Sequence, residues 1–86
     1  MPPQPWHCYV LYSVSTGRLY TGISNDPHKR LAKHNAGKGA KFTRYGRPWR
    51  IVWSKVCEGK GEALKLEYRI KQLRREAKLV MVGLSA

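Results

Sequence analysis

Two tyrosines near the N-terminus are the first side chains whose placement could serve chemistry. Tyr9 and Tyr20 lie in neighbouring segments rich in β-branched and aromatic residues, with Ser15-Thr16-Gly17 between them, which predicts a β-hairpin. Both phenols fall on one face of that hairpin, among small and polar residues. A phenol there can donate to a phosphate oxygen, position a water or act as a base. A single strand tyrosine is usually a packing residue, but two on one such face favour a site.

A cation and an imidazole four residues apart form the second candidate pair. Arg30 and His34 follow Asp26-Pro27, an N-cap residue and a first-turn proline, so we expect a helix to about Ala36 that stops at Gly37. Residues four apart share a helix face. A guanidinium can bind a phosphate with two hydrogen bonds, and histidine exchanges protons near neutral pH. The alternative is that both side chains simply face solvent.

A glutamate in the C-terminal half is the candidate metal ligand. Glu67 lies on the flank of an apolar stripe on a helix that opens at Gly59 or Lys60; the stripe consists of Ala63, Leu66, Ile70 and Leu73. A half-buried carboxylate in so basic a chain needs a partner, either an arginine or a hard cation such as Mg²⁺. Glu62 flanks the stripe on its other side, so the helical pattern alone does not choose between the two acids.

Positive charge is concentrated in the middle of the chain. The 86 residues hold 17 Lys and Arg against 5 Asp and Glu, a net charge of +12, and segment 27–50 has eight basic residues and no acid. A polyanion is the natural partner, because each neutralised phosphate releases counterions; a basic surface that only confers solubility is the alternative. An anionic membrane fits less well, since the segment lacks an amphipathic pattern with large apolar anchors. The side chains expected to contact nucleic acid are Lys33, Lys38, Lys41, Arg44, Arg47 and Arg50, with the interleaved aromatics Phe42, Tyr45 and Trp49 able to stack on unpaired bases.

The remaining pattern supplies the elements that position these groups. We expect the order ββαβαα of an α+β domain, with strands at 7–14, 18–24 and 49–56 and helices at 27–36, from 60 and at 75–82. A two-residue turn at Thr16-Gly17 would pair Val10 with Ile23 and Val14 with Leu19. The chain divides into a proline-rich leader (1–5), one domain (6–82) and a short tail (83–86).

Composition argues against several protein classes. No apolar run approaches the roughly 20 residues of a membrane span, and the first residues lack the basic and apolar regions of a signal peptide. Cys8 and Cys57 lie far apart in the chain, which supports neither a cysteine zinc site nor a disulfide scaffold. We therefore expect a single intracellular domain.

Together these residues resemble the GIY-YIG endonuclease superfamily. The resemblance extends from about Trp6 to Leu73, and the residues that carry it are Cys8-Tyr9, Tyr20-Thr21-Gly22, Arg30 with His34, and Glu67. Within the superfamily the chain is similar to small stand-alone bacterial proteins that consist of this domain only. The segment 34–49 also resembles the nuclease domain of the eukaryotic branched-DNA structure-specific endonuclease. The resemblance implies a three-stranded antiparallel sheet flanked by helices, in a cytoplasmic protein.

The resemblance also implies an activity and a role for each residue. The family hydrolyses phosphodiester bonds with Mg²⁺ (or Mn²⁺), here in DNA selected by structure rather than sequence, in repair or recombination. Tyr9 would be the general base or position the attacking water, and Tyr20 would support the site and contact the phosphate. Arg30 would stabilise charge on the phosphoryl group, and His34 would relay a proton to or from Tyr9. Glu67 would be the sole protein ligand of the hydrated metal.

Two features depart from the family pattern. His7 and Cys8 replace the Gly and Ile of the first motif, and no asparagine follows Glu67, where many members have a catalytic one. We also expect no second domain that recognises a target. Two alternatives therefore stand beside the nuclease: a nucleic-acid-binding module that keeps the fold without catalysis, and a nuclease subunit active only with a protein partner. All three share DNA as the ligand, including branched or single-strand-containing DNA.

Overall fold

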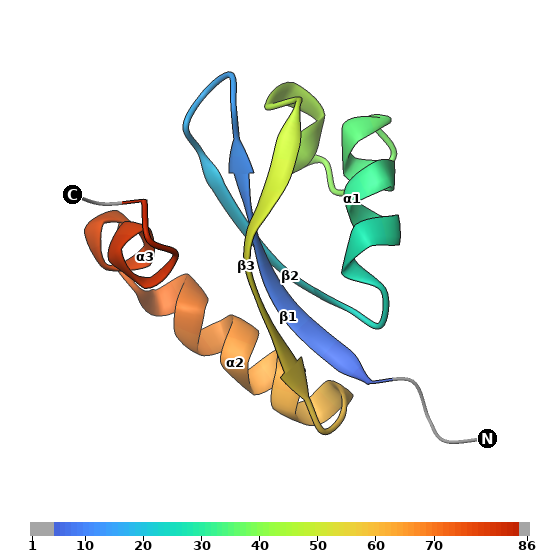
Figure 1. The fold of residues 1–86 in the computed structure, drawn as a ribbon, viewed down its shortest axis with the longest axis vertical. Coiled ribbons are helices and arrows are strands. Elements are labelled where there is room, and N and C mark those ends of the chain that lie inside the picture. Colours follow the sequence, from blue (N-terminus) through green and yellow to red (C-terminus); the bar gives the residue numbers. More distant parts are fainter. Residues whose placement is uncertain (1–4, 85–86) are drawn as a thin grey trace.

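A three-stranded antiparallel sheet forms the centre of the molecule. The computed structural model describes residues 5–84, and its elements are β1 (Trp6–Ser13), β2 (Leu19–Ser24), α1 (Pro27–Asn35), the short 3₁₀ helix η1 (Phe42–Tyr45), β3 (Trp49–Cys57), α2 (Lys60–Gln72) and α3 (Arg75–Met81). The strand order is β2-β1-β3, with β1 central. In Figure 1, α1 lies on one side of the sheet and α2 with α3 on the other. The predicted α+β architecture and element order are confirmed, while most of the predicted leader and part of the tail lie outside the described residues.

The local signals that position α1 act as predicted. The Asp26 carboxylate accepts a hydrogen bond from the Lys29 backbone N–H (3.1 Å), and Pro27 occupies the first helical turn. After the helix, Gly37 adopts a φ of +77°, a left-handed conformation that glycine adopts at little cost. These two ends fix the stretch of chain that carries Arg30 and His34.

The register of the β1–β2 hairpin differs from the prediction. The loop is longer than two residues, because the Ser13 hydroxyl accepts hydrogen bonds from the Thr16 backbone N–H (2.9 Å) and hydroxyl (2.8 Å). Val14, predicted to pair with Leu19, lies outside the ladder and is 60% exposed. An even shift keeps every side chain on its expected face. The observed partners, two residues away from the predicted ones, are Thr21 for Val10 and Tyr12 for Leu19.

Apolar side chains form a cluster on each face of the sheet. Beneath α2 and α3 the cluster contains Cys8, Val10, Cys57, Ala63 and Ile70. On the α1 face a second cluster contains Tyr9, Leu11 and Trp49. The expectation of a face poor in bulky residues around the tyrosines is therefore wrong, since Tyr9 and Leu11 have no exposed surface.

Helix α2 buries only part of its predicted stripe. Ala63 and Ile70 are buried, whereas Leu73 is 39% exposed, because the helix has ended at Gln72 and the Leu73 backbone is extended. Within residues 5–84 no helix is both long and apolar enough to cross a membrane.

Candidate active site

The fold brings Tyr9 and Tyr20 to the α1 face of the sheet, close to His34. Tyr9 is directly opposite Gly22 in the β1–β2 ladder, and a Cβ on Gly22 would lie only 2.7 Å from the Tyr9 hydroxyl. The phenol therefore occupies the space that a side chain at position 22 would need. The Tyr20 ring lies 5.1 Å from the His34 ring, measured between centroids. The lack of a side chain at Gly22 thus makes room for the Tyr9 phenol, and Tyr20 packs beside it against His34.

A chain of three hydrogen bonds runs inward from the Tyr9 hydroxyl. Tyr9 Oη is 3.1 Å from His34 Nε2, and His34 Nδ1 is 2.7 Å from Thr43 Oγ1. Thr43 in turn donates its only hydroxyl proton to the Ala40 carbonyl oxygen (2.9 Å). Tyr9, His34 and Thr43 all have no exposed surface, so the chain is shielded from water.

The direction of these bonds follows from the donors and acceptors available. Because the Thr43 proton is committed to Ala40, the threonine oxygen must accept from His34 Nδ1–H. A neutral imidazole then has its lone pair on Nε2 and accepts the Tyr9 hydroxyl proton. The structure thus presents His34 as an oriented base for the phenol of Tyr9.

Electrostatics keep both members of this pair neutral at rest. Burial lowers the pKa of His34 below its ordinary value, and the Arg30 guanidinium lowers it further. The pKa of Tyr9 is raised by burial and, to a smaller extent, by the neighbouring Tyr20 and Glu67. Arg30 acts in the opposite direction and lowers it. Arg30 is therefore the group that favours the deprotonated phenol.

Thr43 and Gly39 are the site residues that sequence reasoning missed. A Cβ on Gly39 would overlap the His34 imidazole, so only glycine lets the loop close over the ring. Thr43 is held by the buried Trp49, whose Nε1 donates to the Thr43 carbonyl (2.7 Å). No periodicity marks a threonine in such a loop, although the basic, glycine-rich composition marked the segment as important.

Asn35 anchors this loop region rather than taking part in catalysis. Its side chain donates to the Trp49 carbonyl (3.0 Å) and accepts from the Trp49 backbone N–H (2.6 Å). The amide therefore joins the end of α1 to the start of β3. Trp49 is only 3% exposed, so it is a core residue and does not provide a stacking surface.

Glu67 comes from the opposite side of the sheet. It is on α2, which packs across β1 and β2, and its side chain is 19% exposed and 3.4 Å from the Lys71 ammonium. Its charge reaches the sheet: the pKa of Cys8 is raised to about 12 by burial, then by Cys57 and Glu67. Glu62, the other candidate, is exposed and its carboxylate accepts the Glu58 backbone N–H (2.8 Å). Of the two acids, Glu67 is therefore the half-buried one, and it lies on the other side of the sheet from Tyr9 and His34.

A divalent cation at Glu67 would have a single protein carboxylate. Within residues 5–84 no cluster of three His, Cys, Asp or Glu side chains could hold a metal. Mg²⁺ commonly keeps several waters and binds through one or two carboxylates, so an oxygen-only, largely hydrated ion suits this residue.

The basic residues of the middle segment are exposed, except Arg30, which is half-buried. Two aromatic side chains of the same segment are also exposed: Phe42 (46%) and Tyr45 (79%). Arg50 is cross-strand to Tyr12 and lies 5.6 Å from its ring, on the sheet face opposite Tyr9. The exposed cations expected to contact nucleic acid are Lys33, Lys38, Lys41, Arg44, Arg47 and Arg50.

Comparison with known proteins identifies a matching family model and similar bacterial proteins. A family model described as the GIY-YIG catalytic domain matches residues 5–79. The chain is 42% identical over 77 residues to a UPF0213 protein of Staphylococcus saprophyticus, which covers 90% of this chain and 94% of that one. It is 43% identical over 76 residues to a UPF0213 protein of Staphylococcus aureus, covering 88% and 93%.

A solved structure shares the fold. The solution NMR structure of the UPF0213 protein BH0048 from Bacillus halodurans aligns with a TM-score of 0.57 at 38% sequence identity, over 94% of this chain and 85% of that one.

Proposed function

Because this chain belongs to the GIY-YIG catalytic-domain family, we propose that it is an endonuclease that hydrolyses phosphodiester bonds in DNA. We propose further that it uses Mg²⁺ or Mn²⁺, selects DNA by structure rather than sequence, and acts in the cytoplasm in repair or recombination. The observation that carries the proposal is the buried hydrogen-bond chain from Tyr9 through His34 to Thr43.

The geometry of that chain supports a general-base role for Tyr9. Tyr9 has no exposed surface in this structure, so DNA binding would first have to open the site around its hydroxyl. A water attacking the phosphorus would then give a proton to Tyr9 Oη as the phenol passes its own proton to His34 Nε2. The new imidazolium keeps its Nδ1–H bond to Thr43 (2.7 Å), so the ring does not have to turn. The water oxygen forms the new bond to phosphorus, the bond to the leaving oxygen breaks, and that oxygen takes a proton from solvent.

Arg30 and Tyr20 complete the protein's part in the reaction. Arg30 lowers the pKa of both Tyr9 and His34, and its permanent positive charge would stabilise negative charge that develops on the phosphoryl group. Tyr20 packs against the His34 ring at an interplanar angle of 58°, and its phenol can donate to a phosphate oxygen. Arg30 thus favours both the reactive phenolate character of Tyr9 and the charged transition state.

Glu67 is the residue we assign to the metal. Its carboxylate oxygens suit a hard cation, and it is the acid whose charge reaches Tyr9. A bound divalent cation would stabilise negative charge on the leaving oxygen. The ion pair with Lys71 would have to open for the ion to bind.

That same ion pair favours a second candidate function. A carboxylate satisfied by Lys71 at 3.4 Å fits a nucleic-acid-binding module that does not cut, or a nuclease subunit that becomes active only with a protein partner. Metal-dependent cleavage by the isolated chain excludes both.

The test uses a panel of labelled DNAs: single strand, duplex, flap and four-way junction. Wild type is incubated with each DNA in Mg²⁺, in Mn²⁺ and in EDTA, beside Glu67→Ala and the matched control Glu62→Ala, which removes the acid on the other flank of the same helix. We expect metal-dependent cleavage that Glu67→Ala abolishes and Glu62→Ala retains, with DNA affinity of Glu67→Ala equal to or higher than wild type. If wild type binds these DNAs but cleaves none of them, the nuclease proposal is wrong and the binding module is favoured instead.

A further inference from the structure

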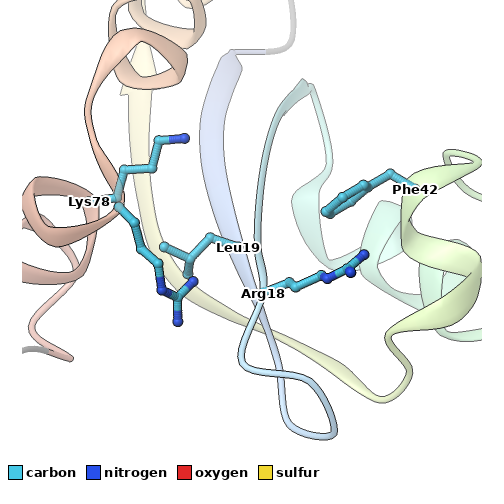
Figure 2. Close-up of a pocket in the computed structure, with 5 residues that line it drawn as sticks. Arg18, Leu19, Phe42 and Lys78 are labelled. Atoms are coloured by element: carbon cyan, nitrogen blue, oxygen red, sulfur yellow. The ribbon is translucent and has the colours of Figure 1, made fainter.

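A basic pocket lies beside the candidate active site, at the end of the hairpin. Figure 2 shows Phe42 on one side of the start of β2 and Lys78 on the other, with Arg18 and Leu19 between them. We call it the hairpin pocket. It is lined by Arg18, Leu19, Phe42, Arg75 and Lys78, and its three cations lie outside the basic middle segment described above.

Within residues 5–84, the three cations of the hairpin pocket have no acidic partner. The ion pair between Lys71 and Glu67 is the one found among residues 5–84, so no carboxylate there neutralises the pocket. Arg75 donates from Nη2 to the Gly17 carbonyl (2.8 Å), which fixes α3 against the hairpin loop and leaves its other N–H groups for a ligand. In Figure 2 the Arg18 side chain extends toward Phe42, whereas Lys78 lies on the other side of β2, so a phosphate bound here would draw these long side chains toward it.

Phe42 gives the pocket an aromatic surface, because nearly half of this residue is left exposed by the packing around it. Its ring is 46% exposed, and the Arg18 guanidinium lies 5.8 Å from the ring centroid. Because that guanidinium lies over the ring, it would have to move aside for a base. An exposed flat ring is what an unpaired base stacks on, whereas a base inside a duplex already has its faces covered. The partner that matches both halves of the pocket is therefore a nucleotide whose base is unpaired.

Two ring contacts link the hairpin pocket to the candidate active site. The Phe42 ring stacks with Tyr20 at 6.1 Å and 23°, and Tyr20 contacts His34 at 5.1 Å. A strand whose scissile phosphate lies near Tyr9 and Tyr20 thus has the pocket next to it along the edge strand β2.

We propose that the hairpin pocket binds one unpaired nucleotide of the DNA strand, with its phosphate between Arg18, Arg75 and Lys78 and its base on Phe42. This inference rests on the proposed action on DNA and names the structural feature that would be selected. A substrate with a single-stranded segment beside the cleavage point is then preferred over a fully paired duplex.

The test measures DNA affinity in EDTA, so that cleavage does not enter. The probes are fluorescein-labelled duplexes with and without a short single-stranded overhang, matched in phosphate number and followed by fluorescence anisotropy at several salt concentrations. The pocket variant Arg18→Gln/Lys78→Gln is compared with Lys65→Gln/Arg69→Gln, which removes the same charges from exposed positions on α2. Phe42→Leu removes the ring and keeps an apolar side chain.

We expect the pocket variant to bind the overhang DNA about tenfold more weakly than its matched control, with a salt slope of log K lower by about one unit. Phe42→Leu should weaken overhang binding by about 5- to 150-fold, the range for losing one stacked base, and leave duplex binding unchanged. Equal losses in the pocket variant and its control, or equal losses on both DNAs, would overturn the proposal. So would failure of wild type to bind the overhang DNA.

A parallel cleavage reaction in Mg²⁺ separates this inference from the proposed function. Wild type that binds the overhang through the pocket but cuts nothing contradicts the nuclease and leaves the pocket standing. Wild type that cuts, with pocket variants that bind as the control does, contradicts the pocket alone. Thermal melts check each variant; if Phe42→Leu does not fold, the charge variant decides.

Discussion

Replacing Thr43 with valine tests the internal hydrogen-bond chain without changing the shape of the core. Valine has nearly the same volume as threonine but no hydroxyl, so His34 Nδ1–H loses its acceptor at 2.7 Å. The Ala40 carbonyl loses the hydroxyl donor at 2.9 Å but keeps the Thr43 backbone N–H at 3.1 Å. All of the Thr43 and His34 surface is buried, so water cannot replace these partners. A buried polar group left without a partner costs about 1–3 kcal/mol, and we expect the free energy of unfolding to fall by about that amount.

The same change should alter the chemistry at Tyr9. With no acceptor at Nδ1, the neutral imidazole gains by moving its proton to Nε2, where it donates to Tyr9 Oη instead of accepting from it. We therefore expect Thr43→Val to lower the single-turnover cleavage rate while DNA affinity stays within about twofold of wild type.

The assays are urea denaturation followed by tryptophan fluorescence, and nitrogen-15 NMR of the His34 ring, which reports the tautomer. Thr43→Ser is the matched control, because it keeps the hydroxyl and loses only a methyl group; it should retain the wild-type tautomer and most of the cleavage rate. An unchanged free energy of unfolding together with an unchanged tautomer in Thr43→Val would refute the hydrogen-bond directions derived above.

Three other perturbations follow from named contacts. Gly22→Ala places a methyl group 2.7 Å from the Tyr9 hydroxyl, so it should lower the free energy of unfolding by about 1–3 kcal/mol, measured in urea, and reduce cleavage; an unaffected enzyme would contradict the close packing. Burial and a neighbouring guanidinium lower the pKa of His34 in the folded protein, so the unfolded chain binds that proton more tightly, and the free energy of unfolding should fall as pH drops below the ordinary value of about 6.5. Urea midpoints between pH 5 and 8 should show that slope in wild type and a weaker one in His34→Gln; identical slopes would remove His34 as its source. Lys41→Gln should lower the salt slope of DNA binding by about one unit, whereas Lys65→Gln, on the exposed side of α2, should not; equal slopes would move the DNA surface elsewhere.

The parts of the fold that the sequence predicted are those with strong local signals. Asp26 and Pro27 define the start of α1, and the β-branched and aromatic segments define the strands. The hairpin register was wrong by two residues because a serine side chain, Ser13, closes the loop by accepting from Thr16. Such a side-chain contact competes with the standard two-residue turn and leaves no periodic signal.

The candidate site also contains residues that the sequence predicted and residues that it did not. Tyr9, Tyr20 and His34 were found from residue type and spacing, and the structure brings them together. The complete burial of Tyr9 and His34 was not foreseen, because it depends on η1 and the preceding loop closing over the sheet. Thr43 and Gly39 do that through a hydrogen bond and an absent side chain, neither of which depends on periodicity. Their importance became visible only with the packed structure.

The central claim is that Tyr9 Oη takes part in phosphodiester hydrolysis, and one pair of substitutions tests it most directly. Tyr9→Phe and Tyr12→Phe each remove a single oxygen from the same strand, but from opposite faces of the sheet. Single-turnover cleavage in Mg²⁺, on whichever DNA of the panel wild type cuts fastest, should be about 100-fold slower or more for Tyr9→Phe, the usual loss of a general base. Tyr12→Phe should stay within about twofold of wild type. Cleavage by Tyr9→Phe at the rate of Tyr12→Phe would contradict the account.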